Sequence, residues 1–138
     1  MENLSLPGFE EPVRSRSRLP VRPVATDSEL RSLGERVPRS VRLGTSSWSF
    51  PGWNGLVWDG QYSSTRLARD GLQAYAAHPL LRNVGVDRTY YAAAPQAQLE
   101  AYRASVPTDF RFVVKAPERL TVARFPDLPR YGADRGHE

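Results

Sequence analysis

Lys115 and Asp87 are the residues best suited to chemistry, because each stands where an apolar run of the sequence ends. A lysine in such a place can hold a phosphate or a carboxylate, or act as a nucleophile if desolvation lowers its pKa. Lys115 is also the only lysine beside 18 arginines, which suggests that an ammonium group is required there. We therefore predict Lys115 and Asp87 as catalytic residues, with Asp87 as a general base or as the partner of Lys115. The alternative is a buried ion pair with a structural role.

Polar and aromatic side chains near the same points form the predicted ligand-binding set. Hydroxyl groups and a guanidinium can bind an anion, although no glycine-rich phosphate fingerprint accompanies them. The aromatic rings can stack on a base or a sugar, or they can pack at the rim without touching a ligand. The predicted ligand-binding residues are Ser46, Trp48, Arg88, Tyr90 and Tyr91.

Five elements must position these residues. Alternating apolar residues predict strands over 41–46, 83–90 and 110–115, and apolar residues at helical spacing predict helices over 63–78 and 95–106. Strands joined by helices run parallel, with right-handed crossovers. The carboxyl ends of the strands then meet at one rim, where α/β proteins build their sites. The sequence therefore predicts an α/β fold with the candidate residues along this rim.

The composition limits the kinds of site that the chain can build. There is no cysteine, which excludes disulfides and thiolate metal sites, and the two histidines, His78 and His137, lie far apart. No carboxylate cluster has ligand spacing, so no metal site is predicted, and the sequence leaves the cofactor unknown. No apolar run is long enough to cross a membrane, and no signal peptide is recognisable. We expect a cytoplasmic protein.

The net charge suggests a second hypothesis. The formal charge is +4 and the pI is about 9.8, as is common in proteins that bind nucleic acids. Residues 1–25 are rich in proline and carry the run Arg14, Arg16, Arg18 and Arg22, so we expect a disordered extension. The alternative function is a nucleic-acid-binding module that uses this extension and the rim aromatics. The preference for arginine over lysine also fits a coding bias, which weakens that alternative.

The chain divides into four parts. After the extension, residues 26–40 form a short helix and linker, for which Thr26 and Glu29 provide a capping box with Thr26 as N-cap. Residues 41–125 form the strand–helix domain. Residues 126–138 form an irregular tail, because no apolar periodicity is present there.

Three segments together resemble a known family. They are GTSSWSF at 44–50, VDRTYY at 86–91 and FRFVVKAP at 110–117, and they look like the first three strand motifs of the YecE-like family, the domain of unknown function 72. The resemblance implies a TIM barrel. It implies no reaction, since none is established for the family as a whole. Relatives commonly carry an acidic residue and an asparagine in the second motif, where this chain has Gly85 and Asp87.

The length of the chain qualifies this expectation. A TIM barrel needs eight strands and about 250 residues, whereas 138 residues provide three predicted strands. We therefore expect the N-terminal three strand–helix units of a barrel, in a truncated or partial chain that is inactive alone. The third strand would present an open edge through which copies could self-associate. The predicted function is to bind a small anionic or phosphorylated ligand at the strand carboxyl rim.

Overall fold

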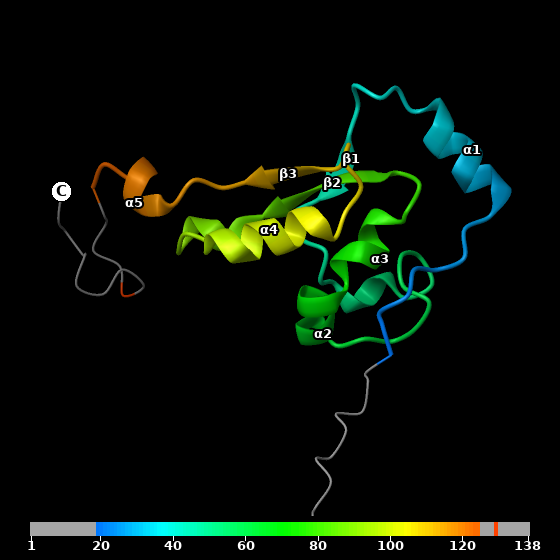
Figure 1. The fold of residues 1–138 in the computed structure, drawn as a ribbon, viewed down its shortest axis with the longest axis horizontal. Coiled ribbons are helices and arrows are strands. Elements are labelled where there is room, and N and C mark those ends of the chain that lie inside the picture. The colour runs from blue at the N-terminus through cyan, green and yellow to red at the C-terminus, as the bar shows by residue number, and fades with distance from the viewer. Residues whose placement is uncertain (1–18, 125–128, 130–138) are drawn as a thin grey trace, which may run out of the picture.

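The computed structural model describes residues 19–124 and 129, and its centre is a sheet of three parallel strands. The strands are β1 (Leu43–Thr45), β2 (Leu81–Val86) and β3 (Arg111–Val114), and they lie in the order β1-β2-β3 (Figure 1). Within the described residues the sheet is open and does not close into a barrel. The predicted α/β class and parallel strands are confirmed, and the arrangement fits a partial series of strand–helix units.

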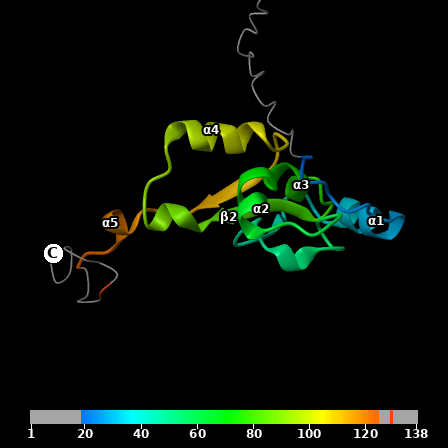
Figure 2. The ribbon, with the colours of Figure 1, turned by 90° about the horizontal axis from the view of Figure 1, so that it is seen from below.

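Helices make the crossover connections between the strands. Two short helices join β1 to β2, and one longer helix joins β2 to β3 and lies along one side of the sheet (Figure 2). Two further helices precede and follow the sheet, and two 3₁₀ turns come after β1 and β2. The α-helices are α1 (Ser28–Arg36), α2 (Ser64–Asp70), α3 (Leu72–Ala76), α4 (Gln96–Ala104) and α5 (Glu118–Thr121), and the 3₁₀ turns are η1 (Pro51–Trp53) and η2 (Asp87–Tyr90).

The hydrophobic core lies between the sheet and these helices. Trp58, Tyr75, Leu67 and Val84 are its largest fully buried side chains. The Tyr75 hydroxyl accepts a hydrogen bond from the Thr45 N–H and donates one to the Asn83 carbonyl, both at 3.1 Å. A buried phenol needs such partners, because an unpaired polar group in the core is costly. Tyr75 therefore fastens α3 to both β1 and β2.

Gly44 allows β1 and β2 to approach closely. The register of the pair is irregular between Leu43 and Gly44. The Asn83 side chain crosses to β1 and donates to the Arg42 carbonyl. A Cβ atom on Gly44 would overlap the carbonyl of Asn83 and its side-chain oxygen. Only glycine fits at this crossing.

The second strand is shorter at its carboxyl end than the sequence predicts. A strand was expected over 83–90, but β2 ends at Val86 and the chain turns into η2. The cause lies in Thr89, whose hydroxyl is 2.7 Å from the Val86 carbonyl. This side-chain bond satisfies a backbone acceptor locally and holds the turn, so the strand does not continue.

The expected disorder of residues 1–25 is wrong for residues 19–25, whereas residues 1–18 lie outside the described residues. Val21 is part of the core, and Pro23 forms an antiparallel bridge with Trp58. The Val24 N–H donates to the Val57 carbonyl at 2.9 Å. Proline-rich composition misled the prediction, because proline is also compatible with extended edge pairing, where its missing N–H is not needed.

The start of α1 also differs from the prediction in detail. The N-cap is Asp27, whose carboxylate accepts from the Leu30 N–H at 2.7 Å, and not Thr26. The Thr26 carbonyl instead accepts from the Arg31 guanidinium at 2.6 Å. Aspartate and threonine are both good N-caps, so a side chain one position away could take the role.

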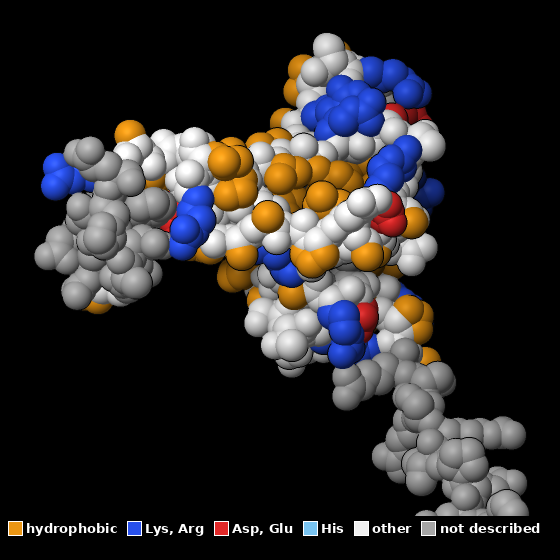
Figure 3. All heavy atoms as spheres, turned by 60° about the vertical axis from the view of Figure 1, so that its left-hand side comes forward, with side chains coloured by type: hydrophobic (Ala, Val, Ile, Leu, Met, Phe, Trp, Pro, Cys, Tyr) orange, Lys and Arg blue, Asp and Glu red, His pale blue; other side chains and the backbone are white. Residues whose placement is uncertain are grey.

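Part of the sheet surface is exposed and apolar. Within the described residues β3 pairs with β2 alone, and Val113, Val114 and Leu43 are exposed. Figure 3 shows hydrophobic side chains gathered across the middle of one face of the molecule. Self-association through this open edge stays a prediction. In the part of the chain that is described, no helix has the length and apolar character needed to cross a membrane.

Candidate functional site

The three strands end in the polar residues that the sequence singles out. Ser46 follows β1, Asp87 follows β2 and Lys115 follows β3, each as the first residue after its strand. Because the strands are parallel, these three residues stand at the same edge of the sheet. Strand geometry therefore gathers one hydroxyl, one carboxylate and one ammonium group along a single rim.

Asp87 and Lys115 form an ion pair at this rim. The Lys115 Nζ lies 3.2 Å from the Asp87 Oδ1, and the side chains are 53% and 48% exposed. The pair is therefore not the buried one that the structural alternative assumed. A pair this accessible to water contributes about 0.2–1 kcal/mol at most. The Asp87–Lys115 pair can therefore separate at a small cost in free energy when another anion binds to the lysine.

A small cavity lies between the ends of β1 and β2. Its volume is about 230 Å³. Gly85 contributes no side chain to it, and the Ser46 backbone passes so near that a Cβ on Gly85 would come within 2.9 Å of the Ser46 carbonyl oxygen. The cavity, hereafter the rim cavity, is lined by Ser46, Ser47, Trp48, Ser49, Gly85, Val86, Asp87 and Arg88.

Trp48 and Arg88 form a stacked pair in the wall of the rim cavity. The Arg88 guanidinium lies 5.9 Å from the centre of the Trp48 ring. Trp48 is only 4% exposed, its indole N–H donates to the Ala68 carbonyl at 3.3 Å, and Tyr102 packs edge-on against it. The tryptophan is thus a fixed platform that holds the arginine at the wall of the rim cavity.

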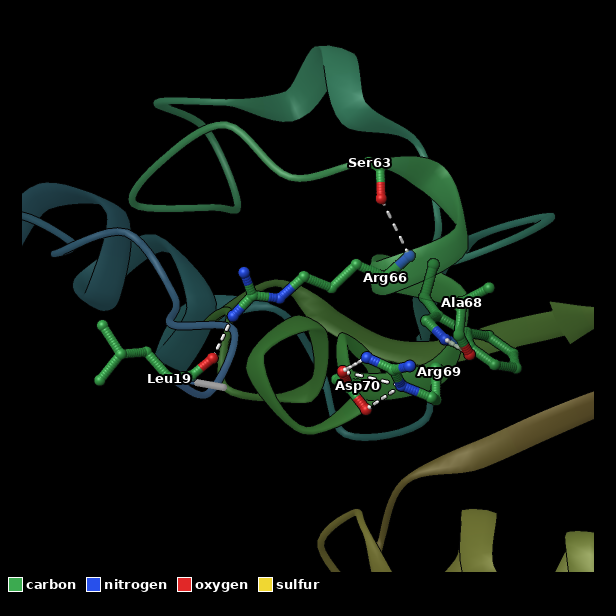
Figure 4. A network of polar contacts seen from close by, with 7 residues as sticks. Leu19, Ser63, Arg66, Ala68, Arg69 and Asp70 are labelled. Atoms are coloured by element: carbon green, nitrogen blue, oxygen red, sulfur yellow. Dashed lines mark hydrogen bonds and ion pairs between the residues drawn. The ribbon is translucent and has the colours of Figure 1, made fainter. Parts of the chain in front are cut away.

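Helix α2 supplies the fixed support for this platform. Its N-cap Ser63 accepts from the Arg66 N–H at 3.3 Å, and the Arg66 guanidinium donates to the Leu19 carbonyl (Figure 4). Arg69 and Asp70 pair at 2.6 Å on the same helix. The N-terminal segment and the helix thereby hold each other in place, and Ala68 remains in reach of Trp48.

A second cavity adjoins the rim cavity. It has a volume of about 570 Å³ and shares Ser49 and Arg88 with the rim cavity. Hydroxyl and amide groups from α2 and α4 face it. The residues that line it are Ser49, Ser64, Thr65, Ala68, Arg69, Arg88, Gln98 and Tyr102.

Tyr90 and Tyr91 lie on η2 and its end, apart from the residues that line these two cavities. Their rings meet edge-to-face, with centres 5.2 Å apart. Tyr91 is 71% exposed. The structure therefore places the predicted aromatic pair next to the rim cavity but does not bring it into the cavity wall.

Thr89 is the site residue that sequence reasoning missed. It is 3% exposed, and its hydroxyl lies 2.8 Å from the Lys115 carbonyl as well as close to that of Val86. The single hydroxyl proton is shared between the two acceptors. The only indication in the sequence is that Thr89 lies between the predicted site residues Asp87–Arg88 and Tyr90–Tyr91. Threonine is common in strands, so its presence in an expected strand does not mark it as a site residue.

The site offers little for a metal ion. Among the described residues, no group of three or more histidine, aspartate or glutamate side chains could hold one. The chemistry available at the rim is therefore that of a lysine, an arginine, a carboxylate and several hydroxyl groups.

Comparison with known proteins assigns the chain to a family. The model of the family described as protein of unknown function DUF72 matches residues 42–130, which is more than half of the chain. Comparison with curated proteins and with solved structures gave no match. The matched segment contains all three strands and every residue of the rim cavity. The chain belongs to the DUF72 family.

Proposed function

We propose that this protein binds a small anionic ligand, a carboxylate or a phosphate ester, at the carboxyl rim of its sheet. The observation that carries the proposal is the rim cavity, which lies between two strand ends and has Asp87 and Arg88 in its wall. Lys115 reaches the same Asp87 from the third strand. A concave site with a few convergent polar groups is the usual form of a small-molecule site.

The charges around the rim favour an anion. Lys115 and Arg88 bring two positive charges, and Asp87 brings one negative charge. The Ser46 hydroxyl makes no hydrogen bond to any described residue, so it is available to donate to a ligand oxygen. A hydroxyl and a guanidinium at the same cavity provide the directional bonds that a carboxylate or a phosphate needs.

Exchange of one anion for another beside Lys115 is the step by which the ligand would enter. The ligand oxygen takes the place of Asp87 beside the Lys115 ammonium, and the exposed ion pair gives way at a cost of about 0.2–1 kcal/mol. Asp87 is then released within reach of the bound ligand, where a carboxylate can serve as a proton acceptor. The volume of about 230 Å³ limits the bound part to a small group.

An amide NMR titration of the full chain tests the proposal. Acetate, inorganic phosphate and glucose 6-phosphate serve as probes. We expect saturable shifts at Ser46 and residues 87–90. Lys115→Gln should weaken binding about tenfold, the loss of one charge-assisted hydrogen bond. Arg103→Gln, on the exposed surface of α4, removes the same charge away from the rim and is the control.

Two outcomes would reject the proposal. One is the absence of saturable shifts at the rim with all three probes. The other is an equal loss of binding in Lys115→Gln and Arg103→Gln, which would mean that only net charge matters. Single-stranded DNA is titrated as a further probe. If only DNA binds at the rim, and its affinity falls steeply as the salt concentration rises, the nucleic-acid hypothesis is favoured.

A further inference from the structure

We infer that the opposite end of the sheet carries a second site, which binds the phosphate group of a small molecule. A cavity of about 570 Å³ lies there, and four arginines and two acidic residues line it. It shares no residue with the rim cavity, so the inference does not depend on the proposed function. The lining residues, hereafter the arginine pocket, are Arg31, Gly34, Glu35, Val37, Arg39, Arg42, Pro79, Arg82 and Asp109.

The strand order assembles the pocket from distant parts of the sequence. Arg42 immediately precedes β1, Arg82 lies at the start of β2, and Asp109 comes shortly before β3. Helix α1 closes the other side with Gly34 and Glu35. In Figure 3 Lys and Arg side chains gather at the top of the molecule, at the level that α1 occupies in Figure 1.

The guanidinium groups are held in place by neutral partners. Arg82 donates to the carbonyls of Gly34 and Val37, the latter at 3.2 Å. Arg42 donates from Nη1 to the Arg39 carbonyl at 3.0 Å and from Nε to the Asp109 backbone carbonyl. A carbonyl fixes the geometry of a guanidinium without removing its charge.

The pocket therefore keeps an excess of positive charge. Four guanidinium groups face two carboxylates, which leaves two positive charges in excess. In the described part of the chain, no ion pair joins these arginines to Glu35 or Asp109. Like charges gathered in one cavity repel each other, and an anion between them removes that repulsion.

Hydrogen-bond donors remain available for such an anion. Among the described residues, Arg42 donates hydrogen bonds from Nε and Nη1, and its Nη2 has no acceptor. Arg31 likewise uses Nε and Nη2 on Thr26 and keeps Nη1. Arg39 donates from its side chain to no described residue. Several planar donors on residues that line one cavity, together with two excess charges, match the dianion of a phosphate monoester better than they match a carboxylate.

Phosphate binding by the full chain tests this inference. The probes are inorganic phosphate and glucose 6-phosphate. Their binding is followed by amide NMR at constant ionic strength. We expect saturable shifts at residues 39–42 and at Arg82. Arg39→Gln should weaken binding at this end about tenfold, the effect of one charge-assisted contact. Arg103→Gln should leave it unchanged, and so should Lys115→Gln, which alters only the rim.

Each result decides for or against the site. If Arg39→Gln does not fold by circular dichroism, Arg31→Gln takes its place, because Arg31 is exposed on α1 and belongs to the same pocket. Equal weakening by Arg39→Gln and Arg103→Gln would overturn the inference, and so would the absence of shifts at residues 39–42. Shifts there with single-stranded DNA, but with neither phosphate probe, would also overturn it.

Discussion

The hydroxyl of Thr89 lies 2.8 Å from the carbonyl oxygen of Lys115, across the gap between the ends of β2 and β3. The same hydroxyl lies 2.7 Å from the Val86 carbonyl. One buried side chain thus connects the turn that carries Asp87 and Arg88 to the residue that pairs with Asp87. The buried Thr89 hydroxyl thus ties together the backbone that carries Asp87 and Lys115, while the charged ends of these two side chains remain exposed to solvent.

Thr89→Val should reveal this connection. Valine has nearly the same shape but leaves the carbonyls of Val86 and Lys115 without their donor, so the free energy of unfolding should fall by about 1–3 kcal/mol. Urea denaturation measures the change. Thr121→Val is the matched control, because the Thr121 hydroxyl is exposed and its carbonyl contacts are long, at 3.4 and 3.5 Å. Equal effects of the two substitutions would contradict a special role for Thr89.

Gly44→Ala should damage the pairing of β1 with β2. The new methyl group would overlap backbone atoms of Asn83, which cannot move without breaking the sheet. We expect a loss of about 3 kcal/mol, at the upper end for overpacked sites. Gly60→Ala provides the comparison, since its methyl group would meet only the Tyr62 hydroxyl oxygen at 3.9 Å and the adjoining ring carbon at 4.0 Å. Thermal unfolding followed by circular dichroism distinguishes the two, and similar midpoints would refute the close approach.

His78 should make the stability depend on pH below neutrality. Burial lowers the pKa of its imidazole below the ordinary 6.5, and its Nδ1 accepts from the Leu80 N–H. The unfolded chain then takes up the proton at a higher pH than the folded chain. Stability from this group is full above 6.5 and is lost as the pH falls through the folded-state pKa.

The variant His78→Gln isolates this contribution. The free energy of unfolding is measured by urea denaturation on both sides of pH 6.5. The free energy of unfolding of the original chain should fall relative to that of the variant as the pH falls. Only the original chain has His78, whose protonation favours the unfolded state. A difference that stays constant with pH would show that His78 titrates alike in both states.

Tyr75 should produce the opposite dependence at alkaline pH. Burial raises the pKa of its phenol above the ordinary 10.0. The folded chain holds this proton to higher pH than the unfolded chain does, so stability is full below 10.0 and falls as the pH rises through the folded-state pKa. Tyr75→Phe should abolish that fall, and should cost about 1–3 kcal/mol at neutral pH because Thr45 and Asn83 lose their partner. An alkaline fall that persists in the variant would assign it to another group.

The parts of the fold that could be predicted are those with a local cause. Alternation placed the three strands, and Ser63 marked the start of α2 because a serine before an apolar helical pattern satisfies its first N–H groups. The predicted ends of the first and third strands, residues 46 and 115, lie one residue beyond the observed ends of β1 and β3. These features depend on neighbours in the sequence, so the sequence expresses them directly.

The parts that could not be predicted depend on distant residues. Thr89 ends β2 through carbonyl contacts that only the folded chain brings together. The arginine pocket combines Arg31 with Asp109, and no spacing rule links positions so far apart. Trp48 bonds to the Ala68 carbonyl and also lines the rim cavity, and no local pattern in the sequence indicates either contact.

The contacts of residues 19–25 decide where this polypeptide can be shortened. The family match begins at residue 42, yet Val21 fills part of the core and Arg66 is anchored on Leu19. A fragment that starts at the family boundary would lose these partners and would expose apolar surface around Trp58. We therefore expect that the smallest protease-resistant fragment needs residues 19–25 in addition to the segment that matches the family.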